Sequence, residues 1–222
     1  MIVVFDLDDT LYPELTFVNS GFHAVSDYLA TQYHLSSHEL FVEMIDILER
    51  EGRGKIFDQL LLQYGIYSQT NTKKCINIYR HHHPQIELYP DAIPCLEMLD
   101  SPQYIVTDGH KIVQKNKIDA LQISPYFKKI YLTHRFGIKY EKPSTYCFQK
   151  ICSEERCSWD EVVYVGDNPL KDFIGLNRLN ANTVRIHRGS YKDMVVDEQH
   201  DAQHHISTLS ELPKILGDLK NV

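Results

Sequence analysis

Short apolar runs alternate with helical patterns along most of the chain. Five runs have the length and composition of buried strands: Ile2–Phe5, Tyr104–Val106, Lys129–Leu132, Val162–Val165 and Thr183–Ile186. Each is bounded by polar or turn residues, which is typical of strands in a parallel sheet with both faces covered. Helical patterns separate the last four: Lys111–Leu121, Ser144–Glu154 and Pro169–Leu179. This alternation predicts right-handed βαβ units and a Rossmann-like, three-layer α/β fold around a parallel sheet.

The long interval between Phe5 and Tyr104 breaks this rhythm. Its patterns predict four helices: Phe17–Gln32, His38–Glu51, Ile56–Tyr64 and Thr72–His82. Ser36 and Glu39 have the spacing of a capping box at the start of the second. Apolar residues recur at helical spacing, so we expect these helices to pack on one another. The chain is therefore predicted to form an α/β core from residues 1–13 and 88–222, and an inserted all-helical domain from residues 14–87.

Two further elements complete the predicted outline. The segment Glu87–Pro94 contains two prolines and is predicted to be the linker that returns the chain from the helical insertion to the core. A last helix is expected near Leu209–Leu216.

Composition narrows the classes of function. The formal net charge is −7 over 222 residues, which argues against a general nucleic-acid-binding protein. No apolar run approaches the roughly 18 residues of a membrane span, and the N-terminus lacks the basic and apolar regions of a signal peptide. The five cysteines are scattered and form no C-x-x-C pair. These features predict a reduced, cytoplasmic protein without membrane or nucleic-acid partners.

Candidate chemistry follows the predicted strands. In open α/β sheets, ligands bind beyond the carboxyl ends of the strands. The polar residues found there are Asp6, Asp8 and Thr10 after the first strand, Thr107, Asp108 and Gly109 after the second, Lys142 after the third, and Asp167 and Asp172 after the fourth. If the sheet is parallel, these residues converge on one edge.

The residue types at this edge are mutually consistent. The carboxylates of Asp6, Asp8, Asp167 and Asp172, with Lys142 as the one lysine counted against them, would repel one another unless a divalent cation bound there. Oxygen ligands in this number suit Mg²⁺. Such an ion would hold a substrate phosphate against a carboxylate nucleophile. Asp6 and Asp8 are two positions apart and therefore point to the same side of an extended chain, as a nucleophile and its acid–base partner require. The Thr107 hydroxyl and the Gly109 backbone can donate hydrogen bonds to phosphate oxygens.

Four short motifs carry a family resemblance: FDLDDT, VTDG, EKP and GDNPLKD, each after a predicted strand. Their order resembles that of the haloacid dehalogenase superfamily of aspartate-nucleophile hydrolases. The helical insertion directly after the first motif is similar to that of members with a C1-type cap.

The resemblance implies a role for each matching residue. Asp6 would attack phosphorus and form an aspartyl-phosphate, and Asp8 would protonate the leaving alcohol and then activate water. Lys142 would neutralise Asp6 and the phosphate. The implied phosphate-binding residues are Thr107, Asp108, Gly109 and Lys142, and the implied Mg²⁺ ligands are Asp6, Asp8 (through its backbone carbonyl), Asp167 and Asp172.

The first motif also indicates a branch of the family. Halide-cleaving members lack the second acid, so Asp8 favours hydrolysis of phosphate esters, as does Thr10. The run FDLDDTLYP resembles the start of nucleotidase-like members. We therefore expect a Mg²⁺-dependent phosphatase of small phosphorylated metabolites, either nucleotide or sugar monophosphates. Arg53 and Lys55, at a glycine-rich break between two cap helices, are candidates for substrate selection.

Three alternatives stay open at this stage. A phosphomutase would use the same aspartyl-phosphate but return the phosphoryl group to substrate, and a non-catalytic member of the family would only bind a phosphorylated ligand. A signalling receiver also combines acids, Mg²⁺, threonine and lysine, but receivers are much shorter and their aspartate follows an interior strand.

Overall fold

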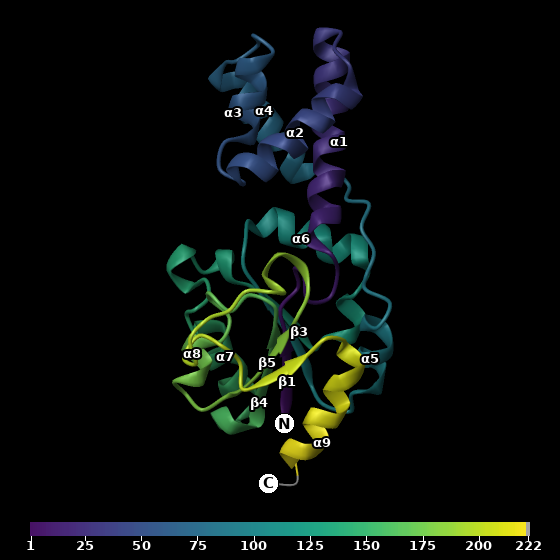
Figure 1. The fold of residues 1–222 in the computed structure, drawn as a ribbon. Helices are drawn as coiled ribbons and strands as arrows, with labels where there is room; N and C mark the ends of the chain where they lie inside the picture. Colours follow the sequence, from purple (N-terminus) through teal and green to yellow (C-terminus); the bar gives the residue numbers. More distant parts are fainter. Residues whose placement is uncertain (221–222) are drawn as a thin grey trace. The chain divides into compact units, whose positions relative to one another are not determined.

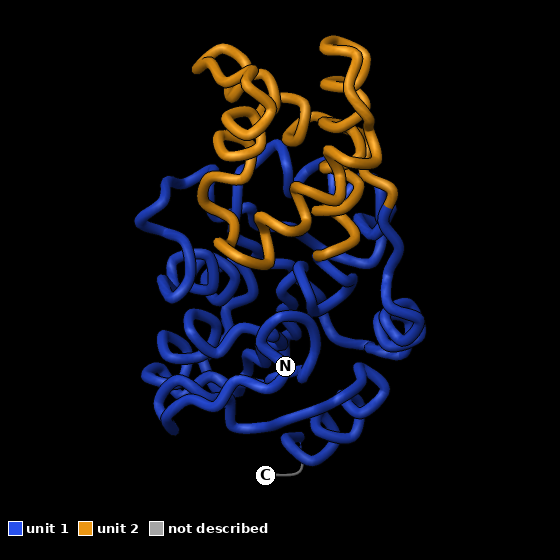
Figure 2. Tube along the Cα trace, turned by 45° about the horizontal axis from the view of Figure 1, so that its top comes forward, with its two compact units in different colours: residues 1–14, 86–222 blue, residues 15–85 orange. Residues whose placement is uncertain are grey.

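The computed structural model describes residues 1–220, and the chain divides into two compact units (Figure 2). Unit 1 comprises Met1–Glu14 together with the chain from Ile86 onward, and unit 2 comprises Leu15–Gln85. None of the helices among residues 1–220 is both long and apolar enough to cross a bilayer.

Unit 1 is built on a six-stranded sheet in which every neighbouring pair is parallel (Figure 1). Its strands are β1 (Ile2–Phe5), β2 (Gln103–Thr107), β3 (Lys129–Leu132), β4 (Val162–Gly166), β5 (Asn182–Ile186) and β6 (His204–Ile206). The predicted α/β fold and its five strands are confirmed to within a residue at each end. The sixth strand was not predicted, because its three residues, HHI, form no apolar run.

The strand order, β3-β2-β1-β4-β5-β6, reverses direction at β1. β1 lies between β2 and β4 because the chain first builds the sheet to one side and then returns to build the other. The backbone N–H of Asp6 continues the pairing past the end of β1 by donating to the Val165 carbonyl at 2.8 Å. Such a reversal leaves a crevice beyond the carboxyl ends of the two central strands, where open α/β sheets bind ligands.

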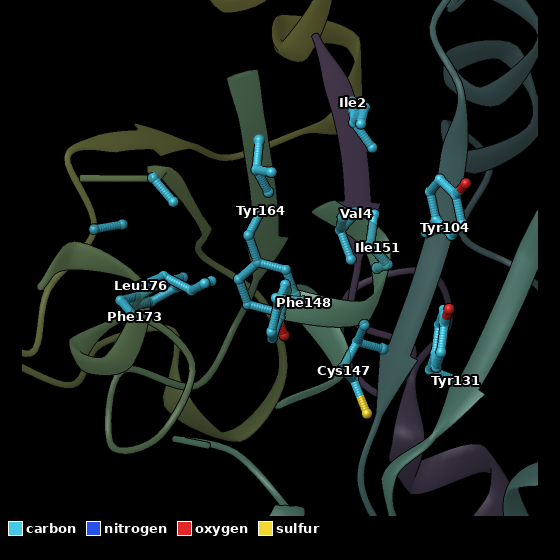
Figure 3. Packing of buried hydrophobic residues seen from close by; sticks show 14 residues of the cluster. Ile2, Val4, Tyr104, Tyr131, Cys147, Phe148, Ile151, Tyr164, Phe173 and Leu176 are labelled. Carbon is cyan, nitrogen blue, oxygen red and sulfur yellow. The ribbon is translucent and has the colours of Figure 1, made fainter. Parts of the chain in front are cut away.

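Helices flank this sheet in unit 1: α5 (Ala92–Met98), α6 (Lys111–Leu121), α7 (Tyr146–Glu155), α8 (Ile174–Asn177) and α9 (Leu212–Lys220). The side chains of Ile2, Val4 and Tyr164 share one face of the sheet and pack against residues of α7 and α8 (Figure 3). The rings of Phe148 and Tyr164 meet edge to face, with their centroids 5.0 Å apart.

Two predicted boundaries in unit 1 were wrong. The helix expected over Pro169–Leu179 is only α8, because the Asn168 side chain accepts a hydrogen bond from Leu170 N, and the Asp172 side chain accepts one from Asn168 N. Such local bonds compete with helix formation. The predicted linker ends at Asp91 rather than Pro94, since Pro94 lies in the first turn of α5, where its missing N–H costs no helical bond.

The segments where the chain leaves and re-enters unit 1, residues 9–14 and 86–91, are joined to each other and are called the stem here. Tyr89 N donates to the Leu11 carbonyl at 2.9 Å. The Arg188 guanidinium donates to the Thr10 carbonyl at 3.3 Å, forms an ion pair with Asp91, and lies 4.3 Å from the centroid of the Tyr89 ring. The stem is therefore closed by bonds that lie wholly within unit 1.

Unit 2 is all helical. It contains α1 (Glu14–Tyr33), of which Glu14 belongs to unit 1, and α2 (Ser37–Glu51), α3 (Ile56–Gln63) and α4 (Gln69–His81). Their apolar faces meet in a core of their own that includes Phe22, Leu29, Met44 and Leu60. At the start of α2 the Ser36 hydroxyl accepts a hydrogen bond from Glu39 N at 3.3 Å, as the capping pattern predicted.

Candidate active site

Asp6 lies directly beyond β1 and is almost fully buried. Its carboxylate faces the Lys142 ammonium, with Asp6 Oδ1 2.8 Å from Lys142 Nζ. Lys142 Nζ is itself 2.8 Å from Asp172 Oδ1 and donates to the Tyr164 hydroxyl at 2.8 Å. A buried ammonium with three oxygen partners is held in one orientation, so the structure brings Asp6, Lys142 and Asp172 together as the motif order predicted.

Tyr164 connects this cluster to the core. Its ring packs among the buried side chains in Figure 3, while its hydroxyl donates to Asp172 Oδ1 at 3.1 Å and accepts from Lys142. Burial, with the nearby Asp172 charge, raises the pKa of the Tyr164 hydroxyl well above its usual value. The hydroxyl therefore stays protonated and acts as a fixed donor.

Three buried carboxylates, those of Asp6, Asp167 and Asp172, have oxygen atoms within 4.8 Å of one another. Burial raises the pKa of Asp6 to about 7 against the opposing charge of Lys142, and burial with the charges of Asp172 and Asp6 raises the pKa of Asp167 to about 9. When all three carboxyls are ionised, they leave two negative charges against Lys142, which one divalent cation would neutralise. The oxygen donors and the uncompensated charge both fit Mg²⁺.

The Asp8 side chain is directed to different partners, on α6 and in the loop after β1. Asp8 Oδ1 accepts from Lys117 Nζ at 2.6 Å and from the Tyr12 hydroxyl at 2.5 Å, and Asp8 Oδ2 accepts from Gln114 Nε2 at 2.9 Å. Burial opposes ionisation, but Lys117, Tyr12 and Gln114 outweigh it, and the pKa of Asp8 is lowered overall. Asp6 and Asp8 thus have separate lysines, and the Asp8 carboxylate is paired outside the acidic cluster. Its predicted role in metal binding was through the main-chain carbonyl, not this carboxylate.

Thr107 ends β2, the strand next to β1, and Asp108 and Gly109 follow it. The Thr107 hydroxyl accepts from Gln114 Nε2 at 2.7 Å. Gly109 has φ +112°, a conformation that other residues rarely adopt, which explains glycine at this turn.

The Asp108 carboxylate is occupied by protein donors. It accepts from Thr133 Oγ1 at 2.8 Å and from the backbone of Lys142 at 3.1 Å, and it pairs with Lys171 Nζ at 3.1 Å. Burial raises the pKa of the Asp108 carboxyl, but the charges of Lys142 and Lys171 and the Thr133 hydrogen bond outweigh burial and lower it. A phosphate contact at Asp108 would therefore come from its main chain, while its side chain positions the segment that carries Lys142.

Arg53 and Lys55 lie in unit 2, on the exposed turn between α2 and α3. Lys55 lines a small hollow of unit 2 with Ile47, Glu51 and Gln59. Their predicted part in substrate selection stays a prediction.

The site also contains residues that were not predicted from the sequence, among them Gln114, Lys117, Tyr164 and Lys171. Tyr164 reads as a strand residue and Lys171 as part of a helix. Gln114 and Lys117 are three apart on a helix that follows a motif residue. This spacing predicts that they share one face, but not that the face meets Asp8.

The position of Lys142 depends on a close approach by Gly175. A Cβ atom at Gly175 would lie 2.2 Å from the Pro143 carbonyl oxygen. We expect Gly175→Ala to displace the Lys142–Pro143 segment, to lower the free energy of unfolding by about 1–3 kcal/mol, and to reduce activity. Urea unfolding and phosphate release would measure both effects.

Gly217→Ala is the matched control, because a Cβ atom there meets no atom within 4 Å and the residue lies in α9. This variant should be as stable as the wild type, or more stable by up to about 1 kcal/mol. Equal behaviour of the two variants would contradict the packing argument.

Comparisons with known proteins show what the chain is similar to. Residues 3–186 match a family described as haloacid dehalogenase-like hydrolase. Two relatives are named glyceraldehyde 3-phosphate phosphatase. That of Methanocaldococcus jannaschii is 32% identical over 98% of this chain and 97% of its own. That of Methanopyrus kandleri is 31% identical over 86% of each chain.

Solved structures also align over nearly the whole chain. A haloacid dehalogenase-superfamily phosphatase from Thermococcus onnurineus has 26% identity and a TM-score of 0.63 over 97% of both chains. A putative hydrolase of the same superfamily from Bacillus subtilis, described as bound to magnesium, has 19% identity and a TM-score of 0.68 over 97% of both chains, and it shows the shared fold.

Proposed function

The chain belongs to the haloacid dehalogenase-like hydrolases, and from this we propose that it hydrolyses small phosphate monoesters with Mg²⁺ through an aspartyl-phosphate on Asp6. One observation carries the proposal: Asp6 and Asp8 follow β1 at the reversal point of the sheet, each beside its own lysine. This arrangement supports Asp6 as the nucleophile and Asp8 as the acid–base group.

The first half-reaction forms the covalent intermediate. Lys117 keeps the Asp8 carboxyl ionised in the free protein, so Asp8 takes up a proton when the anionic substrate binds. Asp6 then attacks phosphorus, the bond from phosphorus to the alcohol oxygen breaks, and Asp8 gives this proton to that oxygen. Lys142 keeps the Asp6 carboxylate oriented and reduces its repulsion of the phosphate. The Thr107 hydroxyl donates to a phosphoryl oxygen.

The second half-reaction regenerates Asp6. Asp8, now a carboxylate, takes a proton from water, and the water oxygen attacks phosphorus while the bond to Asp6 breaks. Inorganic phosphate is released. The side chains of Asp6, Asp167 and Asp172, and the Asp8 carbonyl, would hold Mg²⁺, which when bound neutralises charge on the phosphoryl group.

Glyceraldehyde 3-phosphate is the proposed substrate. The relatives at 31–32% identity carry that compound in their names, which favours a three-carbon sugar phosphate over the nucleotides suggested by FDLDDTLYP.

We propose that unit 2 is the cap domain and that Arg53 and Lys55 select among substrates. Lys55→Ala should therefore change the ratio of kcat/KM between substrates.

A substrate panel tests this proposal. Phosphate release from glyceraldehyde 3-phosphate, p-nitrophenyl phosphate and a pyrimidine monophosphate is measured with Mg²⁺ and with EDTA. We expect the highest kcat/KM for glyceraldehyde 3-phosphate, a loss of at least about 100-fold in EDTA, and recovery on adding Mg²⁺. Equal rates in EDTA would contradict the metal. Phosphoryl transfer to a second sugar without phosphate release would indicate a mutase.

A further inference from the structure

Helix α6 carries two polar side chains that are buried although they lie in a surface helix. Gln114 is 1% exposed and Lys117 is 3% exposed. A spacing of three places both on one face of the helix. Lysine is seldom this buried unless a charged partner accompanies it, so the position of Lys117 requires an explanation.

Asp8 is the principal partner of Lys117. Lys117 Nζ lies 2.6 Å from Asp8 Oδ1, whereas the next carboxylate, that of Glu14, is 3.9 Å away. The second oxygen of Asp8 accepts from Gln114 Nε2. With a donor on each oxygen, the Asp8 carboxylate cannot rotate without breaking a hydrogen bond.

Gln114 has a second contact, with Thr107 at the end of β2. Its Nε2 also donates to Thr107 Oγ1 at 2.7 Å, so the two amide hydrogens serve Asp8 and Thr107. The reverse orientation of the amide would place its oxygen against the Asp8 carboxylate. Because the Thr107 oxygen already accepts, its own proton is directed elsewhere, and the contact with the Asp108 carbonyl is long, at 3.5 Å. The hydroxyl is thereby prepared to donate to a phosphoryl oxygen.

We propose that Gln114 and Lys117 are positioning residues. They hold Asp8, which protonates the leaving oxygen, and Thr107, which donates a hydrogen bond to the phosphate, as one hydrogen-bonded unit. This inference rests on the proposed function. It predicts that the two residues matter most when the leaving oxygen needs a proton at the moment the bond to phosphorus breaks.

Two substrates separate positioning from a structural role. A nitrophenolate leaves without protonation, whereas the alkoxide of glyceraldehyde 3-phosphate needs the proton of Asp8. Single-turnover release of each alcohol is measured with the enzyme in excess. In Lys117→Met and Gln114→Leu, the ratio of the sugar-phosphate rate to the nitrophenyl-phosphate rate should fall at least about tenfold. Lys117→Arg should recover part of the ratio.

Two further readouts sharpen the test. In an Asp8→Asn background, Lys117→Met should change the ratio no further, because the group that it positions is already gone. Competitive inhibition by inorganic phosphate should weaken in Gln114→Leu, which loses the Thr107 contact, and stay unchanged in Lys117→Met. Lys115→Met is the matched control, since Lys115 is exposed on the same helix and forms an ion pair with Asp119, away from Asp8 and Thr107.

The outcomes distinguish the inference from the function on which it rests. A ratio within twofold of wild type in both variants, whatever the loss of total rate, would overturn the positioning role alone. So would a ratio that rises in Lys117→Met, because it would show that Lys117 acts on the pKa of Asp8 and not on its position. A wild-type protein that releases no phosphate from either ester would overturn the proposed function, and the inference with it.

Discussion

Asp6→Asn is expected to lower phosphate release by at least about a thousandfold while the protein remains folded. The amide cannot attack phosphorus, so the covalent intermediate cannot form. Stability should be kept or increased, because the substitution removes one of three crowded buried carboxylates and Lys142 retains Asp172 as its partner. Acid quenching after mixing with phosphoryl-labelled substrate would show label on the wild-type protein and none on the variant.

The control for Asp6→Asn is Asp218→Asn, which changes an exposed aspartate on α9 of the same unit and should be fully active. Mass spectrometry confirms that the introduced asparagine has not deamidated to aspartate. Activity within tenfold of wild type in the intact Asp6→Asn protein would show that the nucleophile lies elsewhere.

Lys142→Met is expected to reduce both activity and stability. The substitution leaves the buried carboxylates of Asp6 and Asp172 without their shared cation, and breaking a buried ion pair in this way costs about 3–5 kcal/mol. Added Mg²⁺ should restore part of the stability by supplying positive charge to the same carboxylates, but it should not restore activity. Urea unfolding with and without Mg²⁺ measures this.

Lys128→Met is the comparison for the loss of a lysine. Lys128 pairs with Glu155 at 2.6 Å, but its side chain is 59% exposed. Exposed pairs contribute about 1 kcal/mol or less, so this variant should unfold near the wild-type urea concentration. If Lys142→Met proved no less stable than Lys128→Met, the buried network would not have the stabilising role assigned to it.

The central strands β1, β2 and β4 were predictable because they are fully buried and their apolar runs are short. β6 was not, because an edge strand of three residues can consist of two histidines and an isoleucine. The helix after β4 was predicted too long, because Asn168 and Asp172 accept hydrogen bonds from backbone groups of their own turn. Apolar periodicity does not reveal such bonds.

Some site residues could likewise be predicted from the sequence and others could not. Asp6, Lys142, Asp167 and Asp172 could be placed together because each follows a strand, and a parallel sheet brings strand ends to one edge. Lys117 could not be placed, because a lysine on a helix normally faces water and only the folded structure shows Asp8 beside it. Because the pairing of Asp8 with Lys117 is invisible in the sequence, the Asp8 carboxylate was counted with those of Asp6, Asp167 and Asp172.

The closed stem has a consequence for how proteins of this architecture can diversify. Because the bond between Tyr89 and Leu11 and the contacts of Arg188 fasten the two segments inside unit 1, the geometry of the sheet does not depend on what the chain builds between them. Residues 15–85 could be exchanged for another domain, or for a short linker, without changing strand order or register. The stem thus gives two fixed junctions at which the inserted domain can be replaced by recombination while the sheet and the residues at its edge are kept.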